Sequence, residues 1–316
     1  MSAHPDVSVV LPTYNRAGEI AGAILSALNQ SAPPDTYELI VVNNNSTDET
    51  ADVVAQLSRE HPGRIRELLE PRQGVAYARN AGIHAARGQI VAFFDDDVRL
   101  AHNWIETIRQ TYNDRPDLVC LGGRVLPDWL SPPPDWLTRT HWAPLALQDF
   151  GDEPMTLSLD NPRGLIGANL TCRKELLERI GGFSPQFQRV KDGIGSLEDD
   201  EWMRRLWKRG ESALYIPELV AHAAVPATRL TRKYHRRWHS GHGRFYALLR
   251  ADEMEQTSVG ALFGVPAHMY RSAIGDLLSW IAAAGRGRLE QAFTHEVKLR
   301  FFRGFFSQRV SERRYS

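Results

Sequence analysis

The sequence predicts an α/β protein, with a mostly parallel sheet flanked by helices and a helical extension at the C-terminal end. Three observations support this fold class. Short β-rich apolar runs alternate with stretches of helical periodicity in the first hundred residues, as in parallel sheets. Polar loops follow these runs. After Pro226 the composition shifts to basic and aromatic residues.

Bulk properties narrow the class of protein. The chain has 316 residues, of which 42% are hydrophobic and 24% charged, so it can bury a sizeable core. Its formal net charge is zero, which gives no general attraction to nucleic acid. Cys120 and Cys172 form neither a disulfide framework nor a metal-binding spacing. No signal peptide and no spanning apolar run is recognised, so we expect a cytoplasmic protein, or one that is peripheral at the inner face of the membrane.

The first two strands are expected at residues 7–11 and 38–42. The first is followed by the loop Pro12, Thr13, Tyr14, Asn15 and Arg16, and then by a helix from about residue 20. The second is followed by the polar run 43–48, where Ser46 or Thr47 is the expected cap of a helix over residues 49–59. Simple turn residues are the alternative interpretation of the asparagines at 43–45.

Three carboxylates follow a buried strand. A third strand is expected at 65–69, a helix opens near Gly74, and an apolar run from residue 90 leads directly into Asp95, Asp96 and Asp97. Ligands of open α/β sheets bind at the carboxyl ends of the strands. Mg²⁺ and Mn²⁺ prefer carboxylate oxygen and often bridge to phosphates. A solvated acidic turn is the alternative interpretation of this run.

Basic side chains near the same edge could meet a phosphate. Arg79 and Asn80 lie in the predicted helix after Gly74, and Arg16 lies in the first loop. The alternative for Arg79 is an ordinary charge on a helix surface.

The middle of the chain is rich in tryptophan and proline. The stretch 129–162 has little periodicity, and loops of this length in compact enzymes are usually functional. Trp129, Trp136 and Trp142 are candidate acceptor contacts, because sugars pack on aromatic rings. For each tryptophan alone, anchoring of the loop to a core is the favoured interpretation.

A second acidic run, Glu198-Asp199-Asp200-Glu201, precedes Trp202 and a predicted helix. Helix capping and the macrodipole explain two such acids, whereas four suggest chemistry. A positioned carboxylate can take the proton of an attacking hydroxyl. An edge strand is expected over residues 215–222, ending at His222.

The last ninety residues form the predicted extension. Five basic residues fall within 229–237, and a helix interrupted by Pro266 is expected over 261–284. Residues 285–316 carry eight Lys or Arg, including Arg313 and Arg314, with Phe301, Phe302, Phe305 and Phe306 interleaved. Basic and aromatic residues on a helix suit an anionic membrane surface. Docking on the catalytic domain or on a second copy in a homodimer is the equal alternative.

Four motifs, in order, resemble family 2 glycosyltransferases of the GT-A fold. They are the loop from Pro12 to Arg16, the run 41–48, the run 78–82 and Phe94-Asp95-Asp96-Asp97. Residues 167–169, 181–183 and 197–202 add similar elements. The resemblance implies a Rossmann-like catalytic domain over 1–225, with a nucleotide-sugar half (1–100) and an acceptor half (101–225), followed by the extension 226–316. Arg237-Trp238 resembles an element of processive relatives only weakly.

The resemblance also implies roles for individual residues. It makes Asp199 the base of an inverting transfer, with Glu198 orienting the base or the acceptor. The implied donor contacts are Pro12, Thr13, Tyr14, Arg16, Asn43, Arg79, Asp95 and Asp96. The implied ligands of Mn²⁺ or Mg²⁺ are Asp95 and Asp97, with His222 as a further candidate that is more often structural. The expected acceptor contacts are Trp129, Trp136, Asp200 and Trp202.

The expected function is therefore metal-dependent, inverting transfer of a sugar from a nucleotide sugar to a hydroxyl of a saccharide or lipid-linked acceptor, in polysaccharide or glycolipid synthesis. A UDP-sugar is the leading donor. Asn43 replaces an acidic residue usual in the family, so GDP and TDP stay open. A nucleotidyltransferase and a non-catalytic carbohydrate-binding scaffold are the alternatives. The first lacks its expected Gly-rich loop after the first strand, and the second has no need of both acidic runs.

Overall fold

The computed structural model describes residues 5–188, 194–251, 261–262 and 265–315, with only the backbone at 261–262 and 312–315. The chain divides into two compact units. Unit 1 comprises Met1–Leu130, Ala146–Gln186 and Glu198–Val225. Unit 2 comprises Ser131–Leu145, Phe187–Leu197 and Pro226–Ser316.

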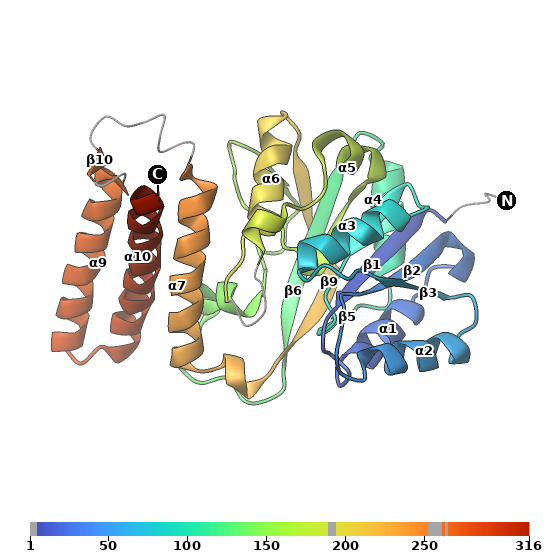
Figure 1. Ribbon diagram of the computed structural model, residues 1–316, viewed down its shortest axis with the longest axis horizontal. Helices are drawn as coiled ribbons and strands as arrows, with labels where there is room; N and C mark the ends of the chain where they lie inside the picture. The colour runs from blue at the N-terminus through green and yellow to red at the C-terminus, as the bar shows by residue number, and fades with distance from the viewer. Residues whose placement is uncertain (1–4, 189–193, 252–260, 263–264, 316) are drawn as a thin grey trace. The chain divides into compact units, whose positions relative to one another are not determined.

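Unit 1 has an α/β fold, in which helices cover both faces of a mixed β-sheet (Figure 1). Its strands are β1 (Val7–Thr13), β2 (Tyr37–Asn43), β3 (Ile65–Leu69), β4 (Ile90–Phe93), β5 (Val98–Leu100), β6 (Cys120–Trp129), β7 (Met155–Leu157), β8 (Leu170–Arg173) and β9 (Ala213–Val225). Its helices are α1 (Ile20–Leu28), α2 (Thr50–Glu60), α3 (Val75–Ala85), α4 (Trp104–Asp114), α5 (Lys174–Ile180) and α6 (Glu198–Lys208).

The strand order places the polar loops together. The sheet runs β3-β2-β1-β4-β8-β6-β9-β5, with β7 paired to β9. The strands β3, β2, β1 and β4 are parallel, as the alternation of strands and helices predicts. Their carboxyl ends therefore lie at one edge. The expectation of an edge strand at 215–222 is wrong, because β9 pairs with both β6 and β5.

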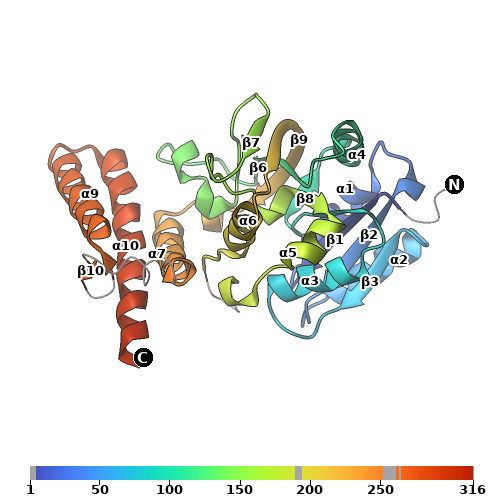
Figure 2. The same cartoon turned by 90° about the horizontal axis from the view of Figure 1, so that it is seen from above.

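Alternating side chains of the strands build the core on one face. Val10, Val91 and Phe93 pack with residues of α3, α5 and α6. Figure 2 shows α3 and α5 on one side of the strands and α1 and α4 on the other. The helix α3 approaches β1 closely, since a Cβ at Gly82 would lie 2.3 Å from Val10. This contact fixes the position of Arg79, one turn earlier in α3.

Unit 2 is built on three long helices, α7 (Arg232–Leu249), α9 (Ala267–Gly285) and α10 (Leu289–Tyr315). The strands β10 (Ala261–Leu262) and β11 (Val265–Pro266) pair before α9, which begins just after Pro266. Phe302 and Phe305 are buried, and Phe306 packs against the core around Phe305.

The phenylalanines expected to meet a membrane therefore belong largely to the packing of unit 2. The side chains of Arg313 and Arg314 lie outside the described residues. Within the described part of the chain, no helix is both long and apolar enough to cross a membrane.

Candidate functional site

The loops after β1 and β2 are bonded to each other. Asn15, whose φ is 53°, accepts a hydrogen bond at Oδ1 from the Thr47 amide at 2.8 Å. The backbone amide of Asn15 donates to Ser46 Oγ at 3.1 Å, and the backbone amide of Arg16 donates to Thr50 Oγ1 at 2.8 Å. These bonds fix the backbone of the loop that carries the predicted donor contacts, among which Tyr14 is exposed.

The asparagine run after β2 has two structural roles. Asn43 Oδ1 accepts from the Ser46 amide at 2.9 Å, so the side chain closes its own turn. Asn44 is buried and donates to the carbonyl oxygens of Glu70 and Arg72 at 3.0 and 2.6 Å. Asn44 thereby joins this loop to the segment before α3, a contact that the sequence analysis missed.

The helix α2 begins at Thr50 after the N-cap Glu49, not after Ser46 or Thr47 as expected, and the acid that bonds to its start is Asp48. Its Oδ1 accepts from the Thr50 amide at 3.0 Å, and its Oδ2 accepts from the Ala17 amide at 3.2 Å. One carboxylate therefore satisfies an amide at the start of α2 and an amide of the first loop.

The carboxylates after β4 are crowded. Asp96 is buried and lies 3.4 Å from Arg16 Nε. Burial, together with the neighbouring charge of Asp97, raises the pKa of Asp96 to about 7 despite Arg16. Burial also raises the pKa of Asp95, although Arg79 opposes the shift. Carboxylate oxygens crowded in this way suit a hard divalent cation, which would offset the repulsion between their negative charges.

Arg79 lies at the centre of the site. Its side chain is buried, which makes the surface-charge interpretation wrong. Nη2 lies 3.1 Å from Asp95 Oδ1, and Nη1 lies 2.8 Å from Asp199 Oδ1 and 3.4 Å from Glu198 Oε1. Burial alone would lower the pKa of the guanidinium, but these three carboxylates raise it. Arg79 is therefore a permanent cation that joins the two acidic runs.

Asp199 is held at both oxygens. Oδ1 accepts from Arg79, and Oδ2 accepts from the Gly167 amide at 2.8 Å. Gly167 opens a short 3₁₀ helix, η4 (Gly167–Asn169), and a Cβ there would lie 2.3 Å from Arg79 Nη2. A side chain at this position would therefore require the guanidinium of Arg79 to move. An ionised carboxylate has further lone pairs, so Asp199 retains the capacity to accept a proton.

The two acids beside Asp199 differ in environment. Glu198 is buried, and its Oε1 lies 3.4 Å from Arg79 Nη1, so it pairs with the cation that also binds Asp199. Burial and the charge of Asp199 raise the pKa of Asp200 to about 6. Asp200 is thus the second candidate, beside Asp199, for a proton-transfer role.

Trp202 does not lie at an acceptor surface. Its side chain is fully buried, its Nε1 donates to the Gly181 carbonyl at 3.0 Å, and its ring centroid lies 5.9 Å from that of Phe183. The Phe183 ring lies in turn 5.2 Å from Arg79 Cζ. Trp202 therefore supports the wall behind Arg79, which corrects its predicted role as an acceptor contact.

The other predicted tryptophans lie in different places. Trp129 ends β6 in unit 1, where it is paired with Val225 of β9 and is half-buried. Trp136 belongs to unit 2, and its ring centroid lies 5.1 Å from that of His235 and 4.9 Å from that of Phe293. For Trp136 these contacts agree with the favoured interpretation of a loop anchor.

The described residues contain no group of three His, Cys, Asp or Glu side chains placed to hold a metal. His222 lies in β9 opposite Arg99 of β5, and it does not complete a preformed ligand set with Asp95 and Asp97. A cation at this site would depend on the aspartates and on oxygens of a bound ligand.

Comparisons with known proteins identify relatives of this chain. The sequence model of a family described as "Glycosyl transferase family 2" matches residues 8–181. A glucosyl-dolichyl phosphate glucuronosyltransferase of Haloferax volcanii is 26% identical over 218 residues, which are 66% of this chain and 66% of that protein. The glycosyltransferase AglE of the same organism is 28% identical over 237 residues, covering 74% of this chain and 72% of its own length.

Solved structures share the fold. A mannosyltransferase of Pyrobaculum calidifontis in complex with GDP-Man and Mn²⁺ has a TM-score of 0.57 and 20% identity, covering 94% of this chain and 86% of its own. TarS of S. aureus, residues 1–349 with UDP, has a TM-score of 0.55 and 16% identity, covering 98% and 92%. At these identities the likeness establishes the fold alone, and it confirms the predicted GT-A class.

Proposed function

The chain belongs to glycosyl transferase family 2, and from that premise we propose that it transfers a sugar from a nucleoside-diphosphate sugar to a hydroxyl acceptor with inversion at the anomeric carbon. One observation carries the proposal. Arg79 binds both Asp95, at the end of β4, and Asp199, at the start of α6. A donor-side carboxylate and a candidate base are thereby held within one charge network.

The donor is held by the loops after β1 and β2. The bonds of Asn15 to Ser46 and Thr47 fix the shape of this surface. Asn43 uses its carbonyl oxygen for Ser46, which leaves the amide NH₂ as the group that would meet a base. An NH₂ donor matches a base carbonyl oxygen, which uracil, guanine and thymine all carry, so UDP, GDP and TDP donors are all to be tested, with UDP first.

Asp95 and Asp97 would hold a divalent cation together with diphosphate oxygens. Mn²⁺ or Mg²⁺ commonly binds through one or two carboxylates plus substrate phosphates, which fits the two aspartates of this loop. When bound, the cation supplies Lewis-acid stabilisation of the departing diphosphate. Arg16, which lies 3.4 Å from Asp96, would keep that carboxylate turned toward the ribose side.

Asp199 would take the proton of the acceptor hydroxyl. Arg79 and the Gly167 amide fix both of its oxygens, so the carboxylate is oriented before the acceptor arrives. A single positioned base is sufficient for direct displacement, whereas a double displacement would require a carboxylate nucleophile as well. Glu198, buried behind the base, holds Arg79 in place.

The acceptor is proposed to be a saccharide or a lipid-linked sugar. One relative is named for its action on glucosyl-dolichyl phosphate, which favours the lipid-linked class. The helix α9 supports a membrane contact, because it exposes large apolar side chains on successive turns, namely Ile274, Leu277, Leu278 and Ile281. Arginines lie near both ends of this stripe, at 271 and 286, and suit an anionic lipid surface.

The decisive experiment is a panel of UDP-, GDP- and TDP-sugars with Mn²⁺ or Mg²⁺, in which release of the nucleoside diphosphate is measured with and without acceptor. Release of a nucleoside diphosphate supports glycosyl transfer. Formation of pyrophosphate from a nucleoside triphosphate would instead support a nucleotidyltransferase. Binding of saccharide with no turnover of any donor would support a carbohydrate-binding scaffold.

A further inference from the structure

Two helices of unit 2 pack backbone against backbone. The helices α7 and α10 run in the same direction, since Arg236 pairs with Glu296 and, further along both helices, Tyr246 packs on Phe305. A Cβ at Gly304 would lie only 1.9 Å from the Ser240 carbonyl oxygen. Because of this close approach, side chains on either side of the contact, from both helices, lie near one another.

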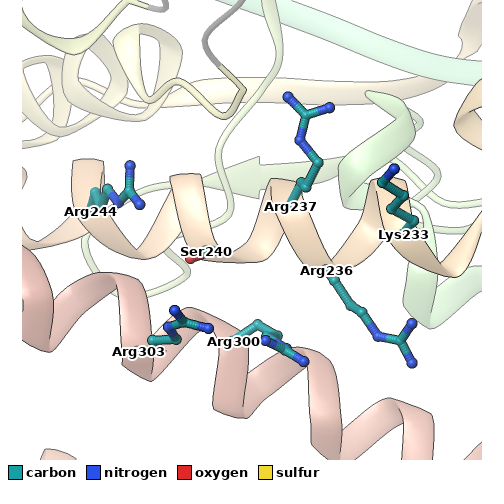
Figure 3. A pocket seen from close by; sticks show the side chains of 7 residues that line it. All are labelled: Lys233, Arg236, Arg237, Ser240, Arg244, Arg300 and Arg303. Carbon is teal, nitrogen blue, oxygen red and sulfur yellow. The ribbon is translucent and has the colours of Figure 1, made fainter.

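Cations flank this contact. A pocket of about 300 Å³ lies between the helices, and Figure 3 shows the side chains that line it. They are Lys233, Arg236, Arg237, Ser240 and Arg244 of α7, with Arg300 and Arg303 of α10. The spacing follows from helix geometry, because residues three or four apart share a face. No acidic side chain is part of this lining.

One acid next to the pocket offsets only part of its charge. Glu296 accepts from Arg236 Nε at 2.7 Å and from its Nη2 at 2.8 Å, and from Arg300 Nη2 at 3.2 Å. The other cations of the lining have no acidic partner in the described part of the chain; these are Lys233, Arg237, Arg244 and Arg303. Like charges on one helix face repel, so a bound anion would stabilise this arrangement.

We propose that this pocket is a binding site for a phosphate-bearing anion with at least two negative charges, such as a diphosphate or a terminal phosphomonoester. Guanidinium groups match the oxygens of phosphate in paired hydrogen bonds. The volume is at the small end of ligand sites, which suits a phosphate group better than an oligosaccharide. Glu296 fixes two of the guanidinium groups before the anion binds. The site lies wholly within unit 2, so the proposal stands apart from the proposed glycosyl transfer.

The test uses the full chain and inorganic pyrophosphate in EDTA, which removes metal-dependent binding at the aspartates of unit 1. Calorimetry should show pyrophosphate binding to the wild type that weakens as salt is raised. The double variant Arg237→Gln/Arg303→Gln should bind at least tenfold more weakly. The matched control Arg59→Gln/Arg115→Gln removes two exposed arginines of unit 1, outside the pocket, and should bind within twofold of the wild type.

The outcomes decide the proposal and its source. No binding to the wild type, or equal weakening in both double variants, would overturn it. Preference for vesicles containing phosphatidic acid over phosphatidylserine at equal surface charge, reversed by pyrophosphate, assigns the site to a lipid phosphate. Pyrophosphate binding without that preference assigns it to a soluble phosphate. Mn²⁺-dependent UDP binding should be unchanged in Arg237→Gln/Arg303→Gln, and loss of UDP binding there would contradict a separate site.

Discussion

Removing the guanidinium of Arg79 should destabilise unit 1 strongly. The side chain is buried and compensates Asp95, Glu198 and Asp199 at 2.8–3.4 Å. In Arg79→Gln these carboxylates would lose their shared cation. Removing one partner of a buried ion pair typically costs about 3–5 kcal/mol. Because Asp95 and Asp199 are only partly buried, we expect the lower end, about 3 kcal/mol of unfolding free energy.

Arg79→Lys separates charge from geometry. Lysine keeps the cation but has a single nitrogen, so it cannot span Asp95 and Asp199 as the two terminal nitrogens of the guanidinium do. We expect a smaller loss, about 1–2 kcal/mol. The variant should nevertheless lose turnover, because Asp199 would no longer be oriented.

The assay is urea denaturation at pH 7.5 in EDTA, followed by the fluorescence of the buried tryptophans of unit 1. Arg87→Gln, an exposed arginine just after α3, is the matched control and should stay within about 0.5 kcal/mol of the wild type. A loss below about 1 kcal/mol for Arg79→Gln, or a similar loss in the control, would refute the view that Arg79 holds the acidic network together.

Three further predictions concern metal, membrane and pH. Excess EDTA should abolish donor turnover, and Asp97→Ala should do the same while its thermal melt stays cooperative; full activity in EDTA would contradict the metal proposal. The wild type should sediment with anionic vesicles at low salt and be released at high salt. The variant Leu278→Ser/Ile281→Ser should bind these vesicles at least fivefold less, whereas the control Leu25→Ser, which changes an exposed leucine of α1, should bind like the wild type. Equal binding of the wild type to neutral vesicles would count against an anionic surface. Burial lowers the pKa of His235 to about 4, so the unfolded chain binds this proton before the folded chain does as pH falls below about 6.5. His235 alone should therefore lower the unfolding free energy by about 2 kcal/mol between pH 7.5 and 5, and His235→Leu should remove that part of the pH dependence; a pH dependence that is the same in His235→Leu would argue against it.

Most of the fold could be predicted from the spacing of apolar residues and from the polar turn residues that follow the strands. The strands β1 to β4 are short apolar runs with polar loops at their carboxyl ends, and both features are local in sequence. The place of β9 inside the sheet, in contrast, depends on pairing with strands that are distant in sequence. Its outer side is covered by β5, a strand of three residues (Val98–Leu100) that directly follows the acidic loop and is too short to stand out.

The site shows the same division. Both acidic runs are visible as sequence, but their meeting depends on Arg79, which is 16 residues from Asp95 and 120 from Asp199. Nothing in the helix pattern distinguishes a buried arginine from an exposed one. Trp202 was misplaced for a related reason, since an aromatic residue next to an acidic run fits a sugar platform and a core wall equally well.

The position of the base is the central claim, and it can be tested by comparing two neighbouring substitutions. Asp199→Asn keeps the size of the side chain but cannot take a proton, so kcat should fall at least about 10²-fold while donor affinity is nearly unchanged. Asp200→Asn should be milder. A near wild-type rate for Asp199→Asn with an inactive Asp200→Asn would move the base by one residue, and wild-type rates for both would contradict the account.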